Sequence, residues 1–425
     1  MGRSYGESGN SRYGRRVLAQ GVEITNNTRI SGLNNNDIIV GNSGCGKTGG
    51  YVVPNIQNID GSLVVSDTKG QLAARFTDEL RAKGYDVYTL DLVNPEKSCG
   101  YNPMSFIRRY EDGSFREQDV LTLARAICPP GMSEEPIWDM SAASYIAFLI
   151  SYCLETAPVE RQNLITVGEL HRQFSRPDGD IPFLQWIDSH RDTFAAKKYF
   201  EITANRSADK MFGSIMGFVN VKLEAYDFRE ARYIFGKSEN FDIRSLGRKK
   251  TVLFLNVSDT DRAFDQMVNI FYTQALQVLC AEADQNADGR LKIPVRLILD
   301  DFAASARIPD FDKVISVIRS RDIYVSLIIQ SMSQLESMYS VAVSRTIINN
   351  CDHIIFLGSQ DLQTSEFIAA RANRTPESVL SMPRNKAYLI SAGEKARLVD
   401  KIRPYSTVAD FDLEESASPE CQILY

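Results

Sequence analysis

Residues 41–48 read Gly-Asn-Ser-Gly-Cys-Gly-Lys-Thr and match the phosphate-binding pattern G-x-x-x-x-G-K-S/T at every fixed position. The residues Asp-Ile-Ile-Val at 37–40 come directly before them and form the short buried-strand pattern that leads into such a loop. Glycines let the backbone curl so that successive N–H groups point at an anion. The pattern therefore predicts a nucleotide-binding loop between a strand and a helix, inside an α/β fold.

The loop pattern implies two cofactors, ATP and Mg²⁺. The Lys47 ammonium can reach the β- and γ-phosphates, and the Thr48 hydroxyl can ligate Mg²⁺. The helix that follows turns its positive end toward the phosphates. The alternative is a glycine-rich turn that matches by chance. The predicted nucleotide-binding residues are Gly41, Asn42, Ser43, Gly44, Cys45, Gly46, Lys47 and Thr48.

The composition is that of a globular protein and excludes some functions. The net charge of −6 over 425 residues argues against a DNA-binding protein with an all-cationic surface. Residues 12–16 and 244–250 form small basic patches, for which a solvated surface is the alternative. Seven cysteines without a C-x-x-C pair indicate reduced thiols in a cytosolic setting. No apolar run approaches the ~20 residues that span a bilayer, and 145–154 is interpreted as a buried helix.

Strand and helix patterns alternate at both ends of the chain but not in its middle. This alternation is typical of a parallel sheet, whereas long helical patterns dominate the middle. We therefore predict an α/β, RecA-like nucleotide-binding domain with a mostly parallel twisted sheet, plus an inserted all-α domain. The predicted boundaries are a polar lead-in at 1–36, the nucleotide-binding domain at 37–104 and 241–408, the all-α domain at 105–240, and an acidic, disordered tail at 409–425.

Two acids follow the apolar strand pattern at 295–299 and supply a second half of the nucleotide site. Asp300 is predicted to hold Mg²⁺ through water, and Asp301 to act as a base or to orient the attacking water. A helix cap or a solvated loop is the alternative for both. Gln330 ends the next strand pattern and is a predicted water-orienting sensor.

Three further positions are candidates for contacts between subunits. Arg319, with Arg321 second, could enter an adjacent subunit's site as an arginine finger. The alternative is a pair of charges favoured at a helix C-terminus. Lys69 follows a strand at the expected ligand edge of the sheet and could touch nucleotide or a neighbouring subunit, or be solvated. The predicted catalytic residues are Lys47, Asp300, Asp301, Gln330 and Arg319.

Pro54 lies in the helix expected after the loop. It lacks an N–H, and its ring faces the carbonyl of Gly50. We expect a kink or an early end of that helix.

Eight short sequence motifs follow one another along the chain. They are the loop at 41–48, Val-Pro-Asn at 53–55, Val-Val-Ser-Asp-Thr-Lys-Gly at 64–70, Tyr-Asn-Pro at 101–103, Leu-Asp-Asp-Phe-Ala at 299–303, Arg-Ile-Pro at 307–309, Ile-Arg-Ser-Arg at 318–321 and Ile-Gln-Ser-Met-Ser-Gln-Leu at 329–335. In combination they resemble the type IV secretion coupling proteins of conjugative elements, the TraG/TraD/VirD family. The resemblance covers about residues 28–405.

The resemblance implies a hexameric ATPase at the cytoplasmic face of the cell membrane, with a monomer expected in isolation. Its implied partners are single-stranded DNA bound to a relaxase, and the proteins of the type IV secretion channel. Lys47 and Thr48 take the family's phosphate-loop positions, and Asp300 takes that of the metal-side acid. The family's sensor glutamine falls on Gln330 and its arginine finger on Arg319.

Two departures from the family pattern leave alternatives open. Family members usually begin with membrane helices, so we expect membrane attachment through segments absent from this chain. Their second strand-end acid is commonly Glu, and the shorter Asp301 could make hydrolysis slow. One interpretation is a motor that couples ATP hydrolysis to translocation, and another is a substrate-docking platform that nucleotide regulates. A chromosomal DNA translocase or a small-molecule kinase is a third.

Overall fold

The computed structural model describes residues 13–129, 136–204, 209–258, 260, 264–302 and 307–402. The chain forms two compact units. Unit 1 comprises residues 1–63, 296–304 and 324–425, and unit 2 comprises residues 64–295 and 305–323.

Unit 1 is built on a strand set with the order β11-β10-β9-β3-β8-β7. The central strand β3 is parallel to both of its neighbours, β8 and β9, whereas β10 and β11 continue the set as antiparallel strands. Every residue of β3 is buried, as expected for a strand inside a parallel sheet. The bounds are β3 (Asp37–Val40), β7 (Val295–Leu299), β8 (Ile323–Ile329), β9 (His353–Phe356), β10 (Lys386–Ser391) and β11 (Arg397–Asp400).

The helices of unit 1 are short. Pro54 has the predicted effect, because the helical segment after the phosphate loop ends at Gln57. The bounds are α1 (Thr28–Ser31), η1 (Thr48–Val52), α2 (Val53–Gln57), α15 (Met332–Tyr339), α16 (Val341–Asn349), α17 (Leu362–Ala372) and α18 (Pro376–Leu380).

The described part of the lead-in is more ordered than its polar composition suggests. It forms an antiparallel ribbon of β1 (Arg15–Ala19) and β2 (Val22–Thr25). The basic-patch interpretation is wrong for Arg16, whose side chain is buried. Its guanidinium donates to both carboxylate oxygens of Asp37, at 2.9 Å and 3.0 Å.

Asp37 is the centre of a buried polar network at the start of β3. Tyr51 donates its hydroxyl to Asp37 Oδ2 at 2.6 Å, and Arg296 on β7 approaches the same oxygen at 3.3 Å. Burial alone would raise the pKa of the Asp37 carboxyl, but Arg16 and Arg296 outweigh it and hold the pKa below its ordinary value. The network therefore joins the lead-in ribbon, two strands and the helical segment after the loop through one carboxylate.

Replacing Asp37 with asparagine is expected to lower the free energy of unfolding by about 3 kcal/mol, because two buried guanidinium groups lose their shared counter-charge. Denaturant unfolding of wild type and variant measures the loss. The control is Asp78→Asn on α3 (Gln71–Ala82), where the carboxylate is exposed and a change within about 0.5 kcal/mol is expected. Equal losses of unfolding free energy in the two variants would contradict the proposed contribution of the network to stability.

Unit 2 combines three strands with many helices. Its strand order is β4-β6-β5, and β5 and β6 run parallel. The bounds are β4 (Ser62–Asp67), β5 (Asp86–Asp91) and β6 (Thr251–Asn256). The helix α3 (Gln71–Ala82) lies between β4 and β5 in the chain, as the predicted alternation of strands and helices requires.

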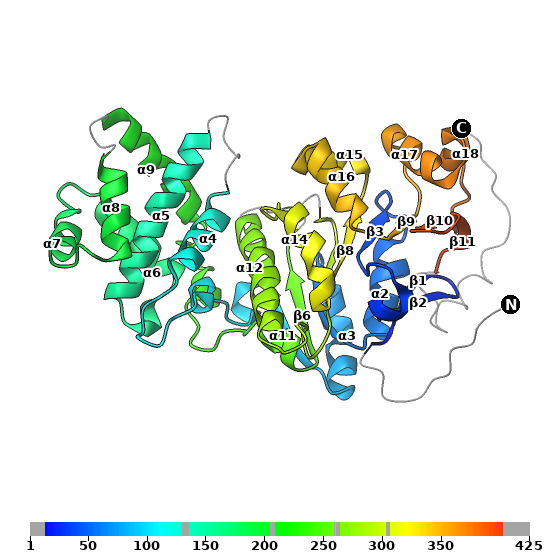
Figure 1. Ribbon diagram of the computed structural model, residues 1–425, viewed down its shortest axis with the longest axis horizontal. Helices are drawn as coiled ribbons and strands as arrows, with labels where there is room; N and C mark the ends of the chain where they lie inside the picture. The colour runs from blue at the N-terminus through cyan, green and yellow to red at the C-terminus, as the bar shows by residue number, and fades with distance from the viewer. Residues whose placement is uncertain are drawn as a thin grey trace. The chain divides into compact units, whose positions relative to one another are not determined.

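The stretch from α4 to α11 contains helices and no named strand among its described residues. The helix α5 contacts α4, α6, α8 and α9, and Figure 1 shows it among them. The bounds are η2 (Pro95–Lys97), η3 (Pro103–Phe106), α4 (Glu117–Ile127), α5 (Pro136–Thr156), η4 (Val159–Arg161), α6 (Leu164–Phe174), α7 (Ile181–Ser189), α8 (Phe194–Ala204), α9 (Asp209–Glu224), α10 (Arg232–Phe235), α11 (Ser245–Arg248), α12 (Asp265–Asp284), α14 (Phe311–Val317) and η5 (Ile318–Arg321).

The helix α5 confirms the interpretation of 145–154 as buried. Phe148 is fully buried, and its ring contacts those of Phe174, Phe183 and Tyr199 at 5.5–5.9 Å between centroids. Over Ile137–Thr156 the helix is long and apolar enough to cross a membrane, and 61% of that stretch is buried inside the structure. The central helix of a water-exposed domain has the same properties, so this feature assigns no membrane span.

Two expectations remain predictions. The acidic tail at 409–425 lies outside the described residues. The domain boundaries also stay predictions, because the two compact units divide the chain at other positions.

Candidate nucleotide-binding site

The phosphate loop lies where the parallel strands of unit 1 end. Val40 is opposite Ile329 of β8 and Phe356 of β9, so the residues after these three strands meet at one edge. Gly41 donates its N–H to Ile329 at 3.1 Å, and Leu357 donates its N–H to Val40 at 2.7 Å. The parallel register thus brings Gly41, Gln330 and Leu357 together.

Three glycines give the loop its path. Gly44 and Gly46 have φ values of 75° and 92°, in the left-handed region that favours glycine. A Cβ on Gly41 would lie 2.4 Å from Cys45 Sγ, so the loop closes on itself there. Cys45 acts here as a packing side chain, and its thiol pKa is raised by burial.

The helical segment after the loop begins with a π-helical turn, η1. Val53 donates its N–H to Thr48, five residues back, and Pro54 has no N–H to offer Gly50. Such wide turns are frequent at functional sites. Asn55 fixes the next turn through two hydrogen bonds of 2.9 Å with the backbone of Val17 on β1. Its side-chain amide accepts from the Val17 N–H and donates to the Val17 carbonyl.

Lys47 lies over the loop. Its ammonium donates to the carbonyl of Gly41 at 2.8 Å and contacts that of Asn42 at 3.3 Å, and the side chain is nearly buried. Neutral carbonyls are weaker partners for an ammonium than phosphate oxygens are. A phosphate bound at the loop can therefore replace these carbonyls as the partner of the Lys47 ammonium.

Thr48 and Asp300 meet although 252 residues separate them in sequence. Thr48 donates its hydroxyl to Asp300 Oδ2 at 2.9 Å, and the N–H of Asp301 donates to Asp300 Oδ1 at 3.0 Å. Burial raises the pKa of Asp300 to about 6, with a smaller contribution from the charge of Asp301. A hydroxyl and a buried carboxylate are oxygen donors of the kind that Mg²⁺ prefers when phosphates complete its shell, so the residues present fit that ion.

Asp301 and Gln330 form a second pair beside the first. Asp301 has a φ of 47°, in the left-handed region, which turns the chain sharply after β7. Gln330 Nε2 approaches Asp301 Oδ1 at 3.5 Å. The two side chains predicted to handle the attacking water therefore lie together in unit 1.

Arg319, Arg321 and Lys69 belong to unit 2. Arg321 is held by Asp284 at 2.8 Å and 3.2 Å. Arg319 lies in η5 and is half-buried, and Lys69 is exposed just after β4. Their roles toward nucleotide or a neighbouring subunit remain predictions.

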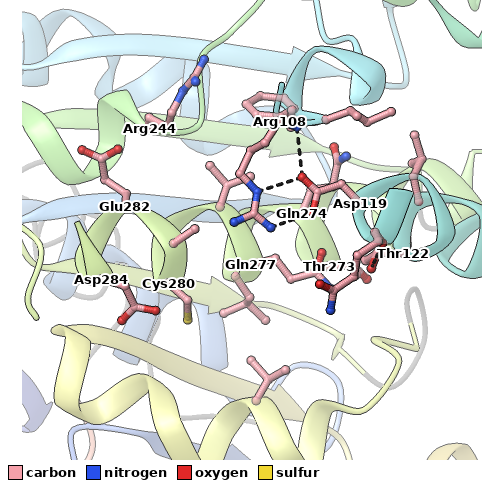
Figure 2. A pocket seen from close by; sticks show the side chains of 18 of the residues that line it. Arg108, Asp119, Thr122, Arg244, Thr273, Gln274, Gln277, Cys280, Glu282 and Asp284 are labelled. Carbon is pink, nitrogen blue, oxygen red and sulfur yellow. Dashed lines mark hydrogen bonds and ion pairs between the residues drawn. The ribbon is translucent and has the colours of Figure 1, made fainter. Parts of the chain in front are cut away.

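Unit 2 also contains a cavity of about 440 Å³ among η3, α4, α12 and α14. Figure 2 shows Arg108 directed at Asp119, with a closest contact of 2.6 Å, while Glu282 is held by Arg248 at 2.7 Å. Because each of these carboxylates has a guanidinium partner, we interpret the cavity as a packing junction of helices.

Sequence reasoning missed one cation near the loop. The Lys401 ammonium donates to the carbonyl of Leu357 at 2.5 Å and lies 3.5 Å from that of Cys45. Lys401 follows the antiparallel pair β10 and β11, and no sequence motif marks it.

Comparison with known proteins agrees with this arrangement. A family model described as "Type IV secretory system Conjugative DNA transfer" matches residues 21–372. VirD4 of Agrobacterium fabrum is 23% identical over 337 residues, which cover 78% of this chain and 48% of that protein. VirD4 of Rhizobium radiobacter is 22% identical over 382 residues, covering 85% and 53%. The chain spans about half the length of these curated relatives.

Solved structures show the same fold at low sequence identity. The plasmid coupling protein TrwB, in complex with a non-hydrolysable ATP analogue, superposes with a TM-score of 0.69 at 16% identity, over 93% of this chain and 90% of that one. VirB4 of Thermoanaerobacter pseudethanolicus gives a TM-score of 0.54 at 11% identity, over 87% and 90%. This likeness confirms the predicted RecA-like α/β fold class.

The chain belongs to the family of type IV secretion proteins for conjugative DNA transfer. It is a coupling protein with a nucleotide-binding P-loop NTPase fold, as the resemblance of its motifs indicated.

Proposed function

We propose that this coupling protein hydrolyses ATP to help move relaxase-bound single-stranded DNA into a type IV secretion channel. The observation that carries the proposal is the 2.9 Å bond between Thr48 and Asp300 beside the phosphate loop. These residues, together with Lys47, supply the parts that a P-loop ATPase needs around one magnesium nucleotide.

Different residues of unit 1 would bind the phosphates and the Mg²⁺ of the nucleotide. The loop 41–48 binds the phosphates with its N–H groups and the Lys47 ammonium. Thr48 Oγ1 would ligate Mg²⁺, and Asp300 would hold it through water. Bound Mg²⁺ neutralises charge on the β- and γ-phosphates. TrwB has been solved with ADP and Mg²⁺, which supports the same ligands here.

Asp301 and Gln330 orient the attacking water, and Asp301 accepts its proton. Their 3.5 Å contact holds both side chains at one place. Aspartate is one methylene shorter than the glutamate common in the family, so we expect slow basal turnover.

The active form that we propose is a homo-hexamer. Arg319 would complete the site of the neighbouring subunit, and Arg321 and Lys69 would lie at the interface. Its partners would be the relaxase with its single-stranded DNA and the proteins of the secretion channel. This chain covers about half the length of its curated relatives, and we propose that segments outside it attach the protein to the cytoplasmic face of the membrane.

A docking platform regulated by nucleotide is the second candidate, and Asp301 in place of glutamate favours it. Steady-state ATP hydrolysis with and without single-stranded DNA, on protein of defined oligomeric state, separates the two. DNA-stimulated turnover supports the motor, whereas nucleotide binding without turnover supports the platform.

The two predicted domains would have different roles in this function. We propose that 37–104 and 241–408 form the nucleotide-driven part and that the all-α domain at 105–240 selects cargo. In the basic stretch at 244–250, three cations have acidic partners, which lowers the net positive charge that the stretch offers to DNA. The pairs are Arg244–Asp242, Arg248–Glu282 and Lys249–Asp86.

A further inference from the structure

Lys401 is the first residue after β11, and its side chain returns toward the phosphate loop. Its backbone N–H donates to Asn385 at 2.9 Å, which fixes where the side chain starts. The half-buried ammonium donates to the carbonyl of Leu357 at 2.5 Å and lies 3.5 Å from the carbonyl of Cys45. One cation therefore joins the end of β9 to the middle of the loop.

The backbone around Lys401 is packed against the same loop. A Cβ on Gly50 would lie 3.4 Å from the carbonyl oxygen of Ile402. Lys401 and Ile402 line a small cavity of about 10 Å³ together with Gly46, Gly50 and Tyr51. The segment after β11 thus forms the outer wall of the loop and of its first helical turn.

The contact of Lys401 with the Cys45 carbonyl affects which way the next N–H of the loop points. The carbonyl of Cys45 and the N–H of Gly46 belong to one planar peptide group, in which they point in opposite directions. A cation on the carbonyl side turns the N–H toward the opposite side. It also polarises the peptide group and makes the N–H a stronger donor.

The half-buried ammonium of Lys401 lacks a negatively charged partner among the described residues. In the part of the chain that the structure describes, no carboxylate lies within ion-pair distance of this ammonium. Its partners are neutral carbonyls, although burying a charge without a counter-charge is unfavourable. A phosphate at the loop would supply the missing negative charge.

We propose that Lys401 is a positioning residue for nucleotide binding, acting through the peptide group between Cys45 and Gly46. The inference rests on the proposed binding of ATP at the loop. Lys401 holds that peptide group with its N–H toward the phosphates and adds a second positive charge behind the loop, in addition to Lys47.

The test compares four proteins by equilibrium titration with a fluorescent ATP analogue in the presence of Mg²⁺. Lys401→Met removes the charge and keeps most of the length, and we expect about tenfold weaker binding. Lys401→Arg keeps the charge and is expected to stay within about threefold of wild type. The control is Lys395→Met, an exposed lysine in the same hairpin, with unchanged affinity expected.

Thermal unfolding of each variant separates positioning from folding. If Lys401→Met is too unstable to titrate, Lys401→Gln replaces it, because glutamine removes the charge but keeps an N–H donor. Neutral variants that bind ATP as tightly as wild type would overturn the inference alone. The inference also fails if Lys401→Arg binds as weakly as Lys401→Met, since charge would then not be the cause. A wild-type chain that binds no nucleotide would overturn the proposed function itself.

Discussion

Replacing Lys47 with alanine is expected to reduce ATP turnover by a factor on the order of 10³, below detection in a steady-state assay. The ammonium that now donates to the carbonyls of Gly41 and Asn42 is the main side-chain cation available to the phosphates. Charge-assisted bonds to phosphate are roughly twice as strong as neutral ones, and alanine has no group that could form them. Phosphate release from ATP, followed over time, measures the effect.

The control for this variant is Lys292→Ala. Lys292 is exposed in unit 2, so its loss removes one positive charge from the protein without touching the loop. We expect wild-type turnover from it. Normal turnover in Lys47→Ala would reject the assignment of the loop as the ATP site.

Arg319→Ala is expected to lower turnover by roughly 10³–10⁵-fold, but only in the assembled oligomer. Arg319 lies in unit 2, whereas Asp301 and Gln330 lie in unit 1. We propose that Arg319 acts on this pair in a neighbouring copy of the chain, so its effect requires assembly. Turnover of monomer and oligomer, measured on fractions of known mass, shows the dependence.

Lys313→Ala provides the matched comparison for Arg319. Lys313 lies on α14, is exposed and forms an ion pair with Asp310, three residues before it. Its removal should leave the turnover of the oligomer unchanged. A loss in Arg319→Ala that is as large in monomers as in oligomers would count against a role in the neighbouring site.

The parts of the site that a local motif marks could be predicted from the sequence. The phosphate loop, the strand β3 and the acids after β7 all have patterns of a few residues. The bond between Thr48 and Asp300 brings the loop and the first of these acids together, as the joint interpretation of the two motifs requires. Pro54 likewise predicted the short helical segment, since a missing N–H acts locally.

The parts that depend on long-range packing could not be predicted. Arg16 reads as a surface charge in a polar stretch, and only its contact with Asp37 explains its burial. Lys401 lies 356 residues from Cys45 in sequence, and it reaches the loop because β10 pairs with β9 and β11 pairs with β10. The π-helical turn after the loop was not predicted either, because Pro54 indicated only a kink or an early end of the helix.

Calorimetric titration of ATP into the wild-type chain and into Asp300→Asn, each with and without Mg²⁺, tests most directly whether Lys47, Thr48 and Asp300 surround one magnesium nucleotide. We predict one saturable site per wild-type chain, tighter binding when Mg²⁺ is present, and loss of most of that Mg²⁺ dependence in Asp300→Asn. The absence of heat on adding ATP, or an Mg²⁺ dependence that is the same in both proteins, would contradict the account.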